Sequence, residues 1–520
     1  MTQLGIDVVP SYVPFSAIYP RRNKGDGKTY PRWRLGRVSG AGITTPRSSR
    51  RRTRCSSSKV LPAGRAKLLL PGGPVIDSAV ADYAGAIDPA VQQRAMQAFE
   101  KRWYDTEPLT ILFYPEDIIA VNPKLSGFDA TTFRPVFYPR PENWTIAGAG
   151  ANASAAFACW PAPDAALPMF GQGYNDSNVA GPVYNQLLEY GSWEKKELSP
   201  ALAEKVDESA DGKTWVISLR QGVKWHDGED FTAEDVVFTW ETIMNPAFAS
   251  DGRAILLDVF GSADAFKITS PYQITVTLPR YSMSMREFVL SAVPIMPKHA
   301  YASIAAEQMR GHTVNTWRGS FTVKTRSGSY TAKGGIGTGP WIAGGYDPLK
   351  KAYTYTKNPH YWQPTTGNVT TYYHVNIQST DAVLSALKSG EIDAHDPLYD
   401  VGPLAGTIDP SWGKVLRFDS YKWQHICYNL RHPVFGTGVD TPLGRKDPAR
   451  AAEAAAYIRK AMSYAIPRDD IIKQMAGGFG HPGTVPIPWS APEYDHDALK
   501  PFPFDMELAR QFMTKAGYTY

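Results

Sequence analysis

The chain has 520 residues, of which 43% are hydrophobic and 12% aromatic, so it is long enough for two or three folded domains. It contains no run of eighteen apolar residues, which argues against a membrane-spanning helix. The net charge of +5 is unevenly distributed, because residues 31–75 hold nine Arg and two Lys without an acid, so the rest of the chain carries −6. A disordered or aberrant basic segment explains this charge better than a nucleic-acid surface does.

The sequence carries no recognisable catalytic or metal-binding motif. Cys55, Cys159 and Cys427 lie too far apart for a CxxC metal site or a disulfide framework. The sequences at 27–29 and 212–214 end like a phosphate-binding loop, but both lack the required earlier glycine. We therefore predict no catalytic residue, no metal site and no cofactor.

The histidines are also too scattered to suggest zinc, and HExxH and GxSxG are both missing. We expect turn or core positions for His226, His299 and His425. Residues 1–15 show no basic region followed by an apolar region, so we expect no signal peptide there.

Periodicity and turn residues predict strands alternating with helices, which indicates an α/β architecture. Residues 211–243 are the most informative part: an Asp-Gly turn, a strand, and a helix that Thr232 caps with Asp235 three residues on. In chain order, the expected elements are a helix at 91–103, a buried strand at 108–114, an Ala/Gly/Pro-rich linker at 146–172, a strand at 215–220, a short strand at 223–225 pairing back on it, the helix after Thr232, a strand at 274–278, strands within 341–355 around a Gly344-Gly345 turn, and a helix at 382–388 ending near Gly390.

The order of residues across 211–243 closely resembles the signature of the family-5 extracellular solute-binding proteins, which serve dipeptide, oligopeptide and nickel ABC importers. Other stretches resemble this family in its own order: 183–189 (an early helix in the family), 199–204, 337–341, 357–362, 390–393, 458–466, 504–510 and 516–518. The resemblance covers roughly residues 174–520.

Part of the resemblance is out of order. Residues 3–8 look like the LGIDV sequence that opens the family's last quarter, and residues 77–144 continue that late region. A circular permutation and a fusion of binding-protein fragments both explain this order. Residues 31–74 match nothing in the family and resemble translation in a shifted reading frame.

The resemblance implies an α/β, two-lobed periplasmic-binding-protein fold of type II, the large peptide-binding class, with a hinged interlobe cleft. The expected division is a piece of the second lobe at 1–30, an aberrant, disordered segment at 31–75, the C-terminal part of the large lobe at 76–145, the linker at 146–172, the large lobe at 173–420 and the second lobe at 421–520.

The resemblance also implies the function: a periplasmic or extracytoplasmic protein, not an enzyme, that binds a peptide or another small solute between its lobes and delivers it to the permease subunits of an ABC importer. No nucleic-acid partner is expected. The alternatives are a peptide or glycan hydrolase and a non-functional fusion of fragments. The solute itself stays open, because peptide-binding relatives hold the ligand's amino group with an aspartate in the region that 31–74 replaces.

Candidate ligand-binding residues follow from the same resemblance. Residues 421–429 resemble the strand that crosses between the lobes, where Trp423 and His425 would share one face and Gln424 the other. Tyr114, Tyr174, Asn178 and Trp489 are further candidates. Each of them could equally serve in packing.

Overall fold

The computed structural model describes residues 73–128, 140–159, 180–192, 197–250, 252–304, 321–325, 328–332, 335–491, 494–495 and 498–519. Both helices and strands alternate along this part of the chain, as the sequence predicts. The segments 1–30 and 31–72, and the candidates Tyr174 and Asn178, lie outside the described residues.

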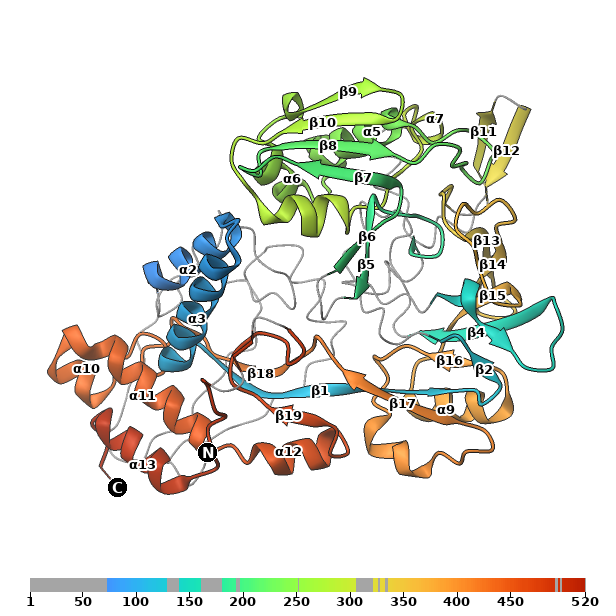
Figure 1. The fold of residues 1–520 in the computed structure, drawn as a ribbon. Coiled ribbons are helices and arrows are strands. Elements are labelled where there is room, and N and C mark those ends of the chain that lie inside the picture. Colours follow the sequence, from blue (N-terminus) through green and yellow to red (C-terminus); the bar gives the residue numbers. More distant parts are fainter. Residues whose placement is uncertain are drawn as a thin grey trace.

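An antiparallel sheet with helices packed on it forms the upper part of the molecule in Figure 1. Trp240 lies at its centre, fully buried and in ring contact with Phe260 and Phe266. Truncating a core residue of this size costs about 3–5 kcal/mol, so this packing alone makes a large contribution to stability. The elements are the strands β7 (Ala203–Glu208), β8 (Thr214–Leu219), β10 (Gln273–Thr277) and β9 (Phe266–Ser270), in that order, and the helices α5 (Ala233–Met244), α6 (Arg253–Phe260) and α7 (Lys298–Tyr301).

The helix after Thr232 is confirmed together with its capping box, since the Thr232 side chain and the Asp235 side chain each accept a backbone N–H of the other's position. The expected strand at 223–225 is wrong. Lys224 instead bridges Asp230, and Phe231 N–H donates to the Val223 carbonyl, so this segment folds back on its own turn rather than on β8.

A second, mixed sheet has the order β13-β14-β15-β4-β16, and it contains the main error of the sequence analysis. Within the predicted linker at 146–172, residues 153–159 form a buried strand that runs parallel to both of its neighbours. The bounds are β13 (Trp341–Asp347), β14 (Ala352–Lys357), β15 (Val369–Asn376), β4 (Ala153–Cys159) and β16 (Ala394–His395), with helix α9 (Thr380–Ser389) packed nearby.

The alanines of β4 have a structural purpose that composition alone conceals. Ala155 and Phe157 pack into the largest apolar cluster, whereas Ala156 and Ala158 pack into a second cluster on the opposite face. A strand buried on both faces needs small or apolar side chains at every position, and such a run has neither alternation nor charge. In sequence, such a run of small residues therefore resembles a flexible connection, although it is a core strand.

Two further expectations are corrected here. Residues 183–189 form no helix, because the carbonyls of Pro182 and Val183 accept from Trp341 and Gly339 and a strand begins at Leu188. Gly344 and Gly345 form a bulge within β13 rather than a turn, since β13 continues to Asp347. Helix α9 does end at Gly390, whose φ of 78° is the left-handed conformation expected of a C-cap.

A third sheet, called here the crossing sheet, connects the part of the molecule that holds the two larger sheets to a group of helices (Figure 1). These two parts are called here the two bodies. Its long strand β1 pairs with three strands, each over a different stretch of its length. The strands are β1 (Leu109–Val121), β17 (Lys414–Asp419), β18 (Gln424–Cys427) and β19 (Gly480–Pro482).

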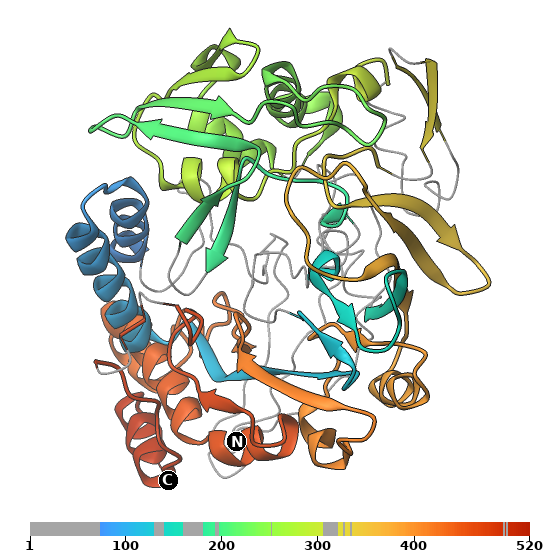
Figure 2. The same cartoon turned by 45° about the vertical axis from the view of Figure 1, so that its right-hand side comes forward.

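The helices at one end of β1 come from distant parts of the sequence. Helix α3 lies beside the C-terminal helices in both Figure 1 and Figure 2, and α2 packs on α3. Buried Arg459 on α11 donates to the carbonyls of Thr106 and Glu107, and Tyr104 stacks on Phe502 at 4.5 Å. The helices are α2 (Gly73–Gly85), α3 (Pro89–Thr106), α10 (Pro442–Lys446), α11 (Ala451–Tyr464), α12 (Arg468–Met475) and α13 (Met506–Lys515).

This packing corrects the predicted division of residues 76–145. The segment does not lie wholly with the large lobe, because α2 and α3 pack with the residues assigned to the second lobe and the crossing point falls inside β1. The order of residues along the chain cannot reveal this boundary between the two bodies, because the continuous strand β1 belongs to both of them.

The remaining described elements are short. They are the strand pairs β2 (Leu125–Ser126) with β3 (Thr145–Ile146), β5 (Leu188–Ser192) with β6 (Glu197–Pro200), and β11 (Phe321–Thr325) with β12 (Gly328–Ala332), and the short helices η2 (Pro141–Asn143), η3 (Pro246–Phe248), η4 (Ala263–Ala265), η5 (Met285–Leu290), η6 (Gly402–Thr407) and η7 (Pro448–Arg450). Among the described residues, no helix has both the length and the apolar character needed to cross a bilayer.

Candidate functional site

The strongest candidate site lies on the crossing sheet, where β1 changes partners. The first part of β1 pairs with β18, residues 113–115 pair with β19, and residues 116–121 pair with β17. Most of β1 is buried, so its apolar sequence is what a central strand requires. Glu116 and Asp117, at the change of partner, are its two charged residues.

Glu116 and Asp419 are directly opposite each other on neighbouring strands. Two like charges at such a position repel. Arg417 offsets this repulsion with a two-pronged ion pair to Glu116, in which Nη2 lies 2.7 Å from Oε1. The Glu116 side chain is 4% exposed and that of Arg417 is 60% exposed, so the arginine reaches the carboxylate from the solvent side.

His481 on β19 completes this group, called here the crossing cluster: Glu116, Asp419 and His481. The His481 Nε2 atom lies 3.3 Å from Asp419 Oδ1 and 3.8 Å from Glu116 Oε1. The imidazole ring stacks on Trp489 with ring centres 4.1 Å apart and planes within 7°. The cluster thus combines nitrogen and oxygen donors with an aromatic surface.

Trp489, a predicted ligand-binding residue, is therefore adjacent to the charged group. It is partly buried, and it also contacts Tyr114 and Tyr494. Tyr114 is completely buried; its hydroxyl donates to the Val485 carbonyl at 2.6 Å. In this conformation Tyr114 offers no surface to a ligand, which fits the packing alternative.

The other three described candidates lie just before and within β18, which pairs with the first part of β1. Gln424 is exposed opposite Phe113, and partly buried Trp423 packs against the apolar cluster that contains Trp489. His425 is half-buried opposite Ile111, and burial lowers its pKa while its Nδ1 has no hydrogen-bond partner. Contact of these residues with a solute stays a prediction.

Asp117 was missed by the sequence analysis. Its side chain is 1% exposed and forms an ion pair with Lys422, but Oδ2 has no partner. Burial raises the pKa of Asp117, although the Lys422 charge opposes this rise. The consecutive acids Glu116 and Asp117 within an apolar strand were the available signal, because a buried strand keeps charged side chains only where they have partners.

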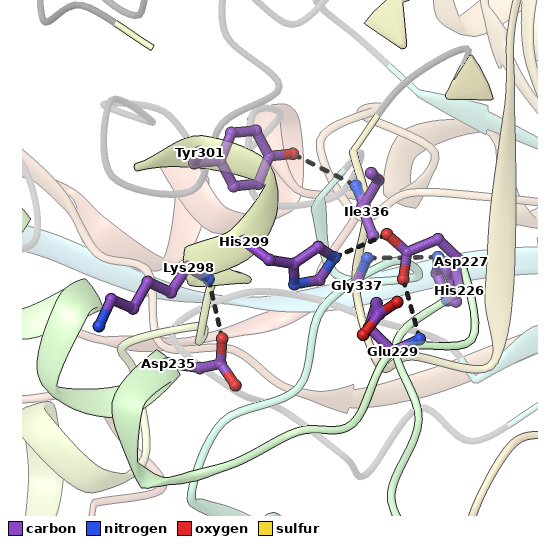
Figure 3. Close-up of polar contacts among 9 residues, drawn as sticks. All are labelled: His226, Asp227, Glu229, Asp235, Lys298, His299, Tyr301, Ile336 and Gly337. Carbon is purple, nitrogen blue, oxygen red and sulfur yellow. Dashed lines mark hydrogen bonds and ion pairs between the residues drawn. The ribbon is translucent and has the colours of Figure 1, made fainter. Parts of the chain in front are cut away.

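A second polar group lies in the upper body and is shown in Figure 3. His226 N–H donates to the Gly337 carbonyl at 2.9 Å, and Gly337 N–H donates back to His226 Nδ1 at 3.3 Å. His226 Nε2 donates to the Gly339 carbonyl at 3.0 Å. Burial lowers the pKa of His226 to about 4, so the ring is neutral and holds two loops together.

The neighbouring Asp227 pairs with His299, whose Nε2 lies 2.7 Å from Oδ2 (Figure 3). Burial lowers the pKa of His299, but the hydrogen bond and charge of Asp227 more than offset this effect and the pKa is raised. Asp227 Oδ1 also accepts the Glu229 N–H at 3.3 Å. These contacts fix the turn that follows β8, and His226 holds a turn position as predicted. The expectation is wrong for His299, which lies on helix α7 with a partly exposed side chain.

The crossing sheet passes between two bodies and carries polar and aromatic side chains at the crossing, an arrangement that suits the class of two-lobed binding proteins. The model of the bacterial extracellular solute-binding proteins, family 5 (middle region), matches residues 197–520. The chain therefore belongs to this family.

Similar proteins extend this finding. A putative ABC transporter peptide-binding protein of Brucella ovis is 28% identical over 326 residues, covering 61% of this chain and 51% of that protein. The periplasmic α-galactoside-binding protein of Rhizobium meliloti is 24% identical over 330 residues, covering 61% and 46%. The chain thus spans about half the length of the curated relatives it matches.

The solved structure of the oligopeptide-binding protein AppA of Bacillus subtilis, in complex with a nonapeptide, has a TM-score of 0.52 at 16% identity and covers 71% of this chain and 65% of that chain. At this identity the likeness establishes the fold. It confirms the predicted α/β binding-protein architecture.

Proposed function

We propose that this protein is the solute-binding component of an ABC importer, which captures a peptide-like or other small solute between its two bodies and presents it to a membrane permease. The observation that carries the proposal is the crossing sheet, in which β1 belongs to both bodies and places charged and aromatic side chains where they meet. Membership of an extracellular solute-binding family supports a location outside the cytoplasm.

The solute would be bound without chemical change. Polar side chains at the crossing would fix its orientation, and closure of the two bodies would remove water and strengthen those contacts. The similar proteins carry names that refer to peptides in one case and to α-galactosides in another, so both classes belong in the test.

The permuted order of the chain is part of this proposal. Residues 109–121, from the segment that resembles the family's last quarter, supply the central strand of the crossing sheet, whereas β17, β18 and β19 come from the segments in family order. Such pairing supports one folded molecule over joined fragments that do not fold together. Genomic sequence across residues 31–75, with the intact mass of the native protein, would distinguish a natural segment from a shifted frame.

The direct test is thermal unfolding of the purified chain alone and with dipeptides, oligopeptides and oligosaccharides. A solute at a hundredfold excess over its Kd should stabilise the protein by about 2.7 kcal/mol. Small-angle scattering should show a smaller radius of gyration with the same solute, and mass spectrometry should recover that solute intact. Cleavage of the solute, or a cooperative transition that no member of the panel moves, would contradict the proposal.

A further inference from the structure

The crossing cluster meets the geometric requirements of a transition-metal site. One donor atom from each of Glu116, Asp419 and His481 lies within 4.8 Å of the other two. Donor atoms bound at about 2.1 Å to one tetrahedral ion lie about 3.4 Å apart. The separations from His481 Nε2, 3.3 Å to Asp419 and 3.8 Å to Glu116, are close to this value.

The three side chains are held by the framework rather than by flexible loops. They project from the three adjacent strands β1, β17 and β19, and Glu116 and Asp419 are direct cross-strand partners. The stack of His481 on Trp489 restrains the imidazole with Nε2 directed at both carboxylates. A site with such preset donors loses little conformational entropy when an ion binds.

Charge supports the same conclusion. The two opposed carboxylates repel each other, and the guanidinium of Arg417 reaches Glu116 with a side chain that is 60% exposed. An ion between the carboxylates would relieve the repulsion, and Arg417 could move into solvent at little cost.

We propose that Glu116, Asp419 and His481 bind a resident divalent transition-metal ion such as Zn²⁺. One imidazole nitrogen and two carboxylate oxygens suit such an ion, and three protein ligands leave coordination positions for water or for an oxygen or nitrogen of a bound molecule. Because β19 contacts helix α12, while Leu416 and Phe418 on β17 pack against the largest apolar cluster, the ion would join the two bodies at their crossing. The site does not depend on the identity of the transported solute.

Titration calorimetry of the full chain with ZnCl₂ and with MgCl₂ tests the proposal. We expect saturable binding of Zn²⁺ with one ion per chain, and weaker binding of Mg²⁺, which prefers an all-oxygen octahedral shell. Asp419→Asn and His481→Gln should each weaken binding at least tenfold. Exposed His360→Gln is the matched control and should leave the affinity unchanged.

Arg417→Met provides the discriminating variant, because it keeps an unbranched chain similar to the aliphatic part of arginine and removes the competing charge. It should tighten binding at least threefold, an effect that general damage to the fold would not produce. Far-UV circular dichroism and a thermal melt confirm that each variant is folded. Folded His481→Gln with wild-type affinity, or Arg417→Met with no gain, would overturn the proposal.

Discussion

Two histidine–carboxylate pairs in this protein use the same side chains in opposite surroundings. The pair of His299 with Asp227 lies in the upper body, where the carboxylate is fully buried and its two oxygens are taken by His299 and a backbone N–H. The pair of His481 with Asp419 lies on the crossing sheet, where both side chains are about one-third exposed and a second carboxylate approaches.

The difference shows how surroundings separate a structural pair from a candidate binding pair. Around Asp227 the protein itself supplies the partners, so the group has little left to offer a ligand and serves to hold a turn. At the crossing cluster the carboxylates oppose each other and depend on one solvent-exposed arginine. This arrangement is compatible with the folded structure, and a bound cation would further reduce the repulsion between the two carboxylates.

The largest expected effect comes from a substitution in the loop at Gly337, which hydrogen-bonds to His226 beside the pair of His299 with Asp227. A Cβ at Gly337 would lie 1.7 Å from the Val183 carbonyl oxygen, and any shift would also break both hydrogen bonds to His226. Gly337→Ala should lower the free energy of unfolding by about 3 kcal/mol in urea titrations. Gly85→Ala, where nothing lies within 4 Å, is the control and should stay within about 0.5 kcal/mol. Equal effects of the two substitutions would show that this loop does not support the fold.

A third histidine sharpens the comparison, since His374 is 2% exposed and neither of its ring nitrogens has a partner. Burial lowers its pKa to about 3. The unfolded chain therefore takes up a proton below about pH 6.5 that the folded protein refuses, so stability falls as the pH falls.

His374→Phe should remove this dependence. The free energy of unfolding of the variant, relative to wild type, should be about 2 kcal/mol more favourable at pH 5 than at pH 7.5. Urea titrations of both proteins at the two pH values give this difference. The exposed His360→Gln serves as the comparison variant. An unchanged slope of stability with pH in His374→Phe would mean that His374 is not held neutral in the fold.

The smallest effects come from the two pairs themselves. The folded pKa of His299 is raised, so its contribution is fully present below about pH 6.5 and is lost as the pH rises through the raised value. At pH 6, His299→Gln should lower the free energy of unfolding by about 0.5–1 kcal/mol, a small effect because solvent reaches the ring. The loss should be smaller at pH 9. His481→Gln should cost less than about 0.5 kcal/mol at pH 6. A larger cost at the crossing cluster would reverse the distinction between the two pairs.

Much of the local structure could be predicted from the sequence. The capped helix after Thr232, the helix at 89–106 and the left-handed Gly390 follow from interactions within a few residues. These features were predictable because capping, helical period and glycine conformation act over short distances. The family resemblance was equally readable, since the residues that carry it are consecutive.

The tertiary structure alone decided the rest. Ala156 and Ala158 became core residues only because a second cluster covers the far face of β4, and no local pattern distinguishes that strand from a linker. The crossing cluster joins residues 116, 419 and 481, which come together because three strands pair in one register. Local structural propensity depends on neighbouring residues. Burial of a strand on two faces and the approach of charges that are distant in sequence depend instead on how the rest of the chain packs around them.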